Sequence, residues 1–258
     1  MELFYTVIIC FIAGAGAGIG TGFAGMSAAA VISPMLIAFL GMPAYQAVGI
    51  ALASDVLASA VSAYTYGKNK NLDVRNGIVM MAFVLLFTVV GSIIAKLVPN
   101  GTMGTFSVFM TLMLGVRFIV KPVMTTKEAM SKVSPKKRLI QSAAGGTAVG
   151  FICGFVGAGG GMMMLMLLTS VLGYELKTAV GTSVFIMAFT ALTGSVSHFI
   201  AGGMPDITVL ILCVLFTFIW ARIASAAANR SDTKTLNRVT GIVLCVISAA
   251  VIIVKLVG

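Results

Sequence analysis

The sequence contains very few charged side chains for its length. Only 9% of its 258 residues are Asp, Glu, Lys or Arg, compared with about a quarter in soluble globular proteins. Residues 3–54 carry no charge, and uncharged runs recur at 76–95, 97–116, 139–174, 178–205 and 239–254. A soluble fold cannot cover so much apolar surface, whereas runs of this length are typical of membrane-spanning helices. We therefore expect an all-α, polytopic membrane protein.

Several chemistries lack the residues that they need. The four cysteines are scattered within apolar runs, and no Cys, His and carboxylate group has the spacing of metal ligands. The sequence has no nucleotide-binding motif of the G-x-x-x-x-G-K-[ST] type, and no nucleophile recurs with a base and an orienting partner. We therefore expect no metal, no cofactor and no enzyme activity.

The net charge of +10 comes mainly from basic residues between the apolar runs. Basic residues in that position act as topology signals, so they do not indicate binding to nucleic acid. The partners that we expect are the lipid bilayer and a small solute.

The sequence repeats itself. When it is shifted by 132 residues, eleven positions between 14 and 49 meet identical residues between 146 and 181. Six of these eleven are glycines in the same order, a match that apolar composition alone does not explain. The sequence therefore predicts two homologous transmembrane halves, 1–121 and 138–258, joined by a basic linker at 122–137.

Each half divides into a long segment, a glycine-rich break, a short segment and three further segments. The breaks are residues 22–27 and 154–161, and the short segments are 27–40 and 160–172. At about 1.5 Å per residue these segments fall short of a hydrocarbon core about 30 Å thick, so we expect re-entrant or half-length helices. The longer segments are 3–22, 44–66, 76–98, 102–121, 138–155, 176–202, 206–226 and 236–257.

The basic residues predict an orientation. With the 67–75 loop inside, 15 Lys and Arg residues lie near the cytoplasmic face, and only Lys96 and Lys255 lie outside. Both termini are then outside, the central linker is cytoplasmic, and the halves are inverted repeats. Inverted repeats with broken helices are typical of secondary transporters, whose binding site lies near the midplane where the breaks meet.

Three motifs carry a resemblance to a known family. They are the repeated Gly-x-x-x-Gly-Phe-x-Gly run, the Gly159-Gly160-Gly161 cluster and the run Ala179-Val180-Gly181-Thr182-Ser183. With them the sequence resembles the sulfite exporter (TauE/SafE) family of bacterial membrane permeases over most of both halves. The resemblance implies a place in the bacterial inner membrane and a substrate such as sulfite, a sulfonate or a similar organic anion. In the first half Ser27-Ala28-Ala29 replaces a glycine cluster, which is a departure from the family pattern.

The breaks are the predicted substrate-binding site. A helix that begins in the midplane offers unpaired N–H groups and a positive dipole end, and glycine lets an oxyanion approach the backbone. The alternative is that these glycines serve helix packing, which we favour for the ladders Gly14-Gly18-Gly22 and Gly146-Gly150-Gly154. The candidate binding residues are Gly25, Ser27, Gly157, Gly159, Gly160, Gly161, Thr182 and Ser183. Thr182 and Ser183 are candidates because of the resemblance alone. Without it, their hydroxyls would be expected to donate to carbonyls of the preceding helical turn, as hydroxyls in membrane helices often do.

Three further residues are candidates for coupling. Asp55 lies near the middle of the 44–66 segment, where a carboxylate costs about 2.5 to 3.5 kcal/mol. Three roles are open to Asp55: a protonatable group beside the substrate, a ligand of a coupling cation, or a neutral group that forms a hydrogen bond between helices. Ser54 adds a donor beside it. His198, near the outer end of the 176–202 segment, suits either proton exchange or interfacial anchoring.

Together with the resemblance, which implies a small sulfur-containing anion as substrate, the sequence favours a secondary transporter that works by alternating access, with proton coupling as one of the roles open to Asp55. The alternative is a passive anion channel on the same scaffold.

Overall fold

The computed structural model describes residues 2–95, 112–113, 115–131, 134–156, 160–202 and 205–257. Every regular element within these ranges is helical, which confirms the predicted all-α class. The helices are α1 (Glu2–Ala24), α2 (Ala29–Leu40), α3 (Ala44–Lys68), α4 (Val74–Ala95), α6 (Lys127–Ser131), α7 (Pro135–Val156), α8 (Gly160–Ser170), α9 (Leu176–Gly202), α10 (Ile207–Arg230) and α11 (Thr233–Val257).

Five stretches of the described residues are long and apolar enough to cross a membrane. They are Leu3–Ala24, Gln46–Lys68, Leu176–Ile200, Ile207–Arg230 and Thr233–Ile253. Large apolar side chains on these helices point outward, including Phe4, Ile200 and Val246. Such a surface suits lipid and not water, so the helices confirm a multi-pass membrane protein.

The starts of four later helices follow the 132-residue shift of the sequence. Helices α7, α8, α9 and α10 begin within one residue of the positions that the 132-residue shift predicts from α1, α2, α3 and α4. The second helix of each half is short, with 12 residues in α2 and 11 in α8. At about 1.5 Å per residue neither crosses a hydrocarbon core, which agrees with the expected half-length segments.

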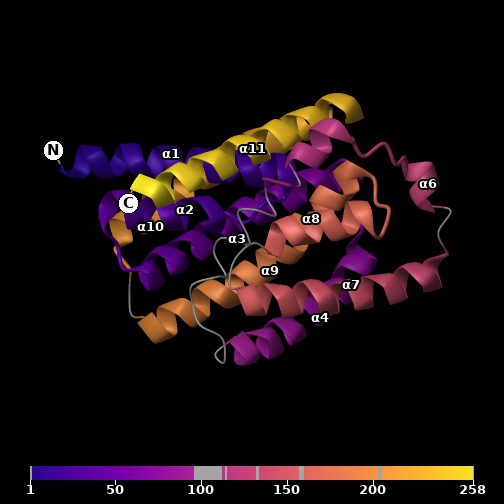
Figure 1. The fold of residues 1–258 in the computed structure, drawn as a ribbon, viewed down its shortest axis with the longest axis horizontal. Helices are drawn as coiled ribbons and strands as arrows, with labels where there is room; N and C mark the ends of the chain where they lie inside the picture. Colours follow the sequence, from indigo (N-terminus) through magenta and orange to yellow (C-terminus); the bar gives the residue numbers. More distant parts are fainter. Residues whose placement is uncertain are drawn as a thin grey trace.

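The long helices pack in pairs that join the two halves. Helix α1 lies along α10, α4 along α7, and α3 along α9 (Figure 1). Under the 132-residue shift the pair α1 and α10 becomes the pair α7 and α4, and the pair α3 and α9 is retained. The two ends of the chain lie at the same end of the bundle in Figure 1, and α6 lies at the opposite end.

The glycine ladders lie at two of these helix pairs. A Cβ atom added to Gly18 would lie 2.6 Å from the carbonyl oxygen of Thr217 in α10. A Cβ atom on Gly150 would lie 2.5 Å from the carbonyl oxygen of Val84 in α4. Backbones approach this closely only where side chains are absent, so the placement agrees with the packing role that we favoured for the ladders.

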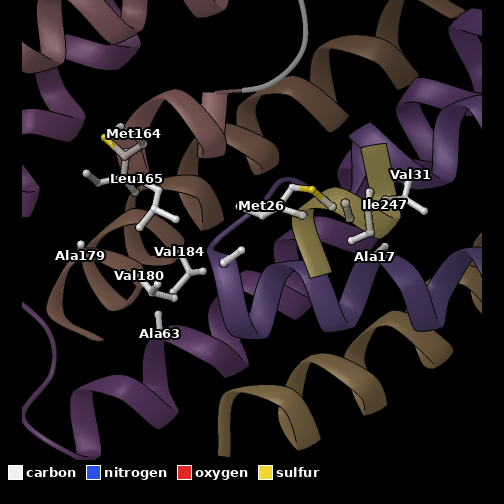
Figure 2. Close-up of a cluster of buried hydrophobic side chains, with 14 of the residues drawn as sticks. Ala17, Met26, Val31, Ala63, Met164, Leu165, Ala179, Val180, Val184 and Ile247 are labelled. Atoms are coloured by element: carbon white, nitrogen blue, oxygen red, sulfur yellow. The ribbon is translucent and has the colours of Figure 1, made fainter. Parts of the chain in front are cut away.

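The core surrounds the point where α1 stops. Figure 2 shows Met26, just after α1, directed toward Ile247 of α11, with Ala17 and Val31 nearby. It also shows Val180 and Val184 of α9 between Leu165 of α8 and Ala63 of α3. All of these side chains are buried, so apolar packing from both halves holds the interrupted segment in place.

The carbonyl groups at the end of α1 are satisfied by side-chain hydroxyls. A helix end leaves its last carbonyls without intrahelical partners, and a membrane interior offers no bulk water to replace them. Four hydroxyls, from α1, α3, α9 and α11, donate to carbonyls between residues 22 and 26. The bonds run from Tyr66 to Gly22 (2.8 Å), from Thr240 to Phe23 (3.1 Å), from Ser183 to Gly25 (3.1 Å) and from Thr21 to Met26 (2.8 Å).

Replacement of Tyr66 by Phe tests this arrangement. The Tyr66 side chain is fully buried, so Tyr66→Phe leaves the Gly22 carbonyl unsatisfied at a cost of about 1 to 3 kcal/mol. We expect the melting temperature of the purified protein to fall by about 2 to 10 °C. Tyr64→Phe is the matched control, because Tyr64 lies on the same helix and is exposed. Equal melting temperatures for both variants would contradict the assignment.

Candidate functional site

The two breaks meet inside the bundle. A Cβ atom on Gly161, in the first turn of α8, would lie 2.5 Å from the carbonyl oxygen of Gly25 and 2.9 Å from the nitrogen of Ser27. Gly25 itself has a φ of +59°, a left-handed conformation that favours glycine. Gly160 is the first residue of α8 and is half-buried. The structure thus brings Gly25, Ser27 and Gly161 together, while Gly157 and Gly159 lie outside the described residues.

Thr182 and Ser183 are adjacent in sequence, but their side chains form hydrogen bonds with different parts of the protein. The Ser183 hydroxyl donates to the Gly25 carbonyl at 3.1 Å, so this residue reaches the first break from the second half. The Thr182 hydroxyl accepts a hydrogen bond of 3.2 Å from the backbone N–H of Asp73, at the start of α4. Of the two, Ser183 lies at the meeting point of the breaks and Thr182 binds the α3–α4 connection.

Asp55 is in α3, and its carboxyl group faces the start of α2. Its carboxyl group accepts hydrogen bonds from the Ser27 hydroxyl at 2.7 Å and from the Ser59 hydroxyl at 2.8 Å. The Ser27 oxygen in turn accepts a weaker bond of 3.4 Å from the N–H of Ala29, in the first turn of α2. The side chain of Asp55 is only 1% exposed. The protein's own carboxyl group therefore occupies the first-break position where we expected a substrate anion.

The second break has a different side chain at the matching position. The 132-residue shift pairs Asp55 with Met187, which is buried. A Cβ atom on Gly161 would lie 2.5 Å from the Met187 sulfur, and the Ser183 hydroxyl lies 3.9 Å from that sulfur. The start of α8 therefore faces a thioether, while the start of α2 faces a carboxyl group.

Two predicted coupling residues lie apart from the Asp55 carboxyl group. The Ser54 hydroxyl donates to the Ile50 carbonyl of its own helix at 2.9 Å, so its single proton is committed there. His198 follows Ser183 by 15 residues on α9, which corresponds to about 22 Å along the helix axis. His198 packs beside Gly49 of α3, where a Cβ atom on the glycine would lie 3.3 Å from the His198 Cβ.

Two residues that were not predicted from the sequence contribute to the site. Ser59 donates to Asp55, and its position one helical turn later was a usable signal. Tyr66, which donates to the Gly22 carbonyl, lies two residues after Tyr64 in a segment without a distinct polar face, so its role had no clear signal in the sequence.

The chemistry that this arrangement offers is hydrogen bonding near one ionisable group. The hydroxyl protons of Ser27 and Ser183 are donated to Asp55 and to the Gly25 carbonyl, so the donors for a ligand are the backbone N–H groups at the start of α8. Within the described ranges no cluster of three or more His, Cys, Asp and Glu side chains is suited to hold a metal ion. Such a site can bind an anion through neutral donors and move a proton on Asp55.

Comparisons with known proteins agree with a membrane carrier. The chain is 25% identical to the probable membrane transporter protein YunE of Bacillus subtilis (strain 168), over 91% of this chain and 90% of the relative. It is 20% identical to the probable membrane transporter protein YdhB of the same organism, over 82% and 86%. It is 23% identical to the probable membrane transporter protein ORF9 of Sinorhizobium sp, over 91% and 87%.

No solved structure matches the chain significantly. The model of the sulfite exporter TauE/SafE family matches residues 10–251, which cover both halves and both breaks. On this match, the chain belongs to the sulfite exporter TauE/SafE family of membrane transporters.

Proposed function

We propose that the protein is a secondary transporter that carries a small sulfur-containing anion, such as sulfite or a sulfonate, across the bacterial inner membrane. The observation that carries this proposal is the contact between the two breaks, where Gly161 packs on Gly25 and Ser27. The backbone N–H groups at the start of α8 are neutral donors beside this contact, and the Ser27 hydroxyl links the contact to the Asp55 carboxyl group. Direct packing of one break on the other suits alternating access, in which the two halves move against each other, better than a permanently open channel.

The arrangement of the helices supports inverted halves. Helix α1 begins at the end of the bundle that holds the chain termini, whereas α7 begins beside α6 at the opposite end (Figure 1). We call this opposite end the basic end, because Lys and Arg side chains gather in the connections there. These include Lys68, Lys70, Lys127, Lys136, Lys137, Arg230 and Lys234. By the positive-inside rule the basic end is cytoplasmic and both termini are outside.

Side-specific labelling tests this topology. Ala44 begins α3 and Lys177 lies at the start of α9, so inverted halves place them on opposite faces. In cysteine-free protein, Ala44→Cys should react with an impermeant maleimide in intact cells, and Lys177→Cys only after permeabilisation. Reaction of both positions from the same side would refute the inverted arrangement.

The binding of sulfur oxyanions is the direct test of function. A ligand that binds the folded state raises its stability by about 2.7 kcal/mol at 100 times its dissociation constant, and this raises the melting temperature. We expect sulfite, thiosulfate or a short sulfonate to stabilise the purified protein, and carboxylates such as acetate to do so less. Chloride at equal ionic strength is the control. Stabilisation by none of the sulfur anions beyond chloride would exclude this substrate class.

Asp55 is the proposed coupling group. When its carboxyl group is ionised, it holds the Ser27 hydroxyl and repels an anion that approaches the breaks. When it is protonated, the repulsion disappears and the carboxyl group donates a hydrogen bond. Binding of the anion is therefore accompanied by uptake of a proton, and release of the anion by loss of that proton.

Asp55→Asn separates binding from coupling. Asparagine keeps the shape and the neutral charge of the protonated side chain, so we expect the variant to bind the anion. The wild-type affinity should fall as the pH rises from about 5 to about 8, because ionised Asp55 opposes the anion, and the variant should show no such fall. Accumulation driven by a proton gradient in liposomes should be lost.

Asp232→Asn is the matched control. Asp232 caps α11 on the exposed surface, and hydrogen bonds from the side chain and backbone of Thr235 hold its pKa below the usual value. It is ionised throughout this pH range, so its replacement should leave the pH profile unchanged. A wild-type profile and rate in Asp55→Asn would show that Asp55 is structural.

A further inference from the structure

The connection between α3 and α4 is bonded to the second half of the chain at the basic end. The Tyr174 hydroxyl, just before α9, donates to the Asp73 carboxylate at 2.9 Å. The Asp73 N–H donates to the Thr182 hydroxyl oxygen at 3.2 Å. The Asn71 side chain donates to the Asn229 side chain of α10 at 2.7 Å. Three polar bonds therefore tie the connection to α9 and α10.

The same region is filled by Arg138, at the start of α7. The side chain of Arg138 is only 7% exposed, and its guanidinium group lies 4.8 Å from the centre of the Tyr174 ring. It also donates to the Met130 carbonyl. Burial, followed by the charge of Asp73, raises the pKa of Tyr174 above its usual value, so the hydroxyl stays protonated as a donor. The Tyr174 side chain therefore contacts both the Asp73 carboxylate and the Arg138 guanidinium group at this end of the bundle.

The matching place at the other end of the bundle is hollow. The 132-residue shift pairs Arg138 with Thr6 and Tyr174 with Met42. Thr6 and Met42 line a pocket of about 330 Å³ between the start of α1, the end of α2 and the start of α10. Of these matching positions, Arg138 and Tyr174 pack against each other at the basic end, whereas Thr6 and Met42 line a pocket at the other end.

The polar bonds of the basic end have no equivalents in the sequence of the other end. The shift pairs Asp73 with Pro205, which has no backbone N–H to donate. It pairs Thr182 with Ile50, which has no side-chain oxygen to accept. The hydrogen bond from the Asp73 N–H to the Thr182 hydroxyl therefore has no counterpart between Pro205 and Ile50.

We propose that Asp73, Tyr174, Arg138 and Thr182 form a gate that closes the basic end, and that the gate opens when the pocket at Thr6 and Met42 closes. The proposal rests on the proposed alternating access, in which the two ends exchange states. It assigns Thr182 to this gate and leaves Ser183 at the breaks. The structure then represents the state that is closed at the basic end and hollowed at the other.

Two reporter positions test this coupling in the full-length purified protein. Thr6→Cys reports on the pocket, which Thr6 lines. Ser142→Cys reports on the space under the gate, because Ser142 lies one turn after Arg138, is 1% exposed, and has a hydroxyl without a hydrogen-bond partner in the described part of the chain. Each reporter is placed in a chain whose native cysteines are replaced by serine, and the rate of reaction with a polar maleimide is measured.

Tyr174→Phe removes the hydroxyl that binds Asp73 and keeps the ring beside Arg138. Loss of a hydrogen bond to a charged group shifts an equilibrium about tenfold or more. We expect Ser142→Cys to react about tenfold faster in this variant and Thr6→Cys to react several-fold more slowly. Thr182→Val, which removes the acceptor for the Asp73 N–H, should shift both rates in the same directions. Tyr64→Phe, at an exposed position, should change neither.

The reciprocal change distinguishes a gate from a local contact. Faster reaction at Ser142→Cys with an unchanged rate at Thr6→Cys would show that the bonds only stabilise the basic end, and the gate would be refuted. Unchanged rates at both reporters in both variants would refute it as well. Stabilisation of the wild-type protein by sulfur anions is measured in parallel. Its presence alongside a failed gate test leaves the proposed function standing, and its absence removes the function itself.

Discussion

The interruption of α1 inside an apolar bundle is the constraint on which the rest of the structure depends. Each buried carbonyl left without a partner costs about 1 to 3 kcal/mol, and lipid cannot supply a donor. The donors at this helix end come from Thr21, Tyr66, Ser183 and Thr240, which lie on four helices and in both halves. Neither half can therefore satisfy the first break alone, and the break binds the two halves together at the site.

Within the described residues, the sequence predicted the order of the helices and the interruption after α1, because both depend on strong local signals. Long uncharged runs and clustered glycines leave few alternatives, and the repeat places the helices of one half where the other predicts them. The partners of individual hydroxyls were not predictable. Ser54 bonds its own helix and Ser183 crosses to the other half, although both lie in apolar segments. Helix rotation decides between these outcomes, and a helix that is apolar on all sides has no preferred face in its sequence.

Asp55 was predictable as an unusual residue but not as the partner of Ser27. A carboxylate in the middle of an apolar run is conspicuous in any sequence, and the structure does bury it. Its contact with Ser27 spans 28 residues and depends on how α2 returns toward α3. The matching Met187 carries no charge, so the repeat supplies two similar backbones with unlike chemistry. Any proton exchanged at the meeting point of the breaks therefore belongs to the first half.

The chemical difference between the two halves also bears on the relative energies of the two end states of the proposed alternating-access cycle. A transporter built from identical halves would populate its two end states equally, because exchanging the halves leaves the contacts unchanged. Here the basic end has a hydrogen bond from Tyr174 to the carboxylate of Asp73, worth about 1.5 to 3 kcal/mol, while Met42 stands at the matching position of Tyr174. A difference of about 1.4 kcal/mol is a factor of ten in population. In the proposed mechanism, the anion and the proton have to bind the state that is open at the basic end more tightly by about 1.5 to 3 kcal/mol to offset this hydrogen bond.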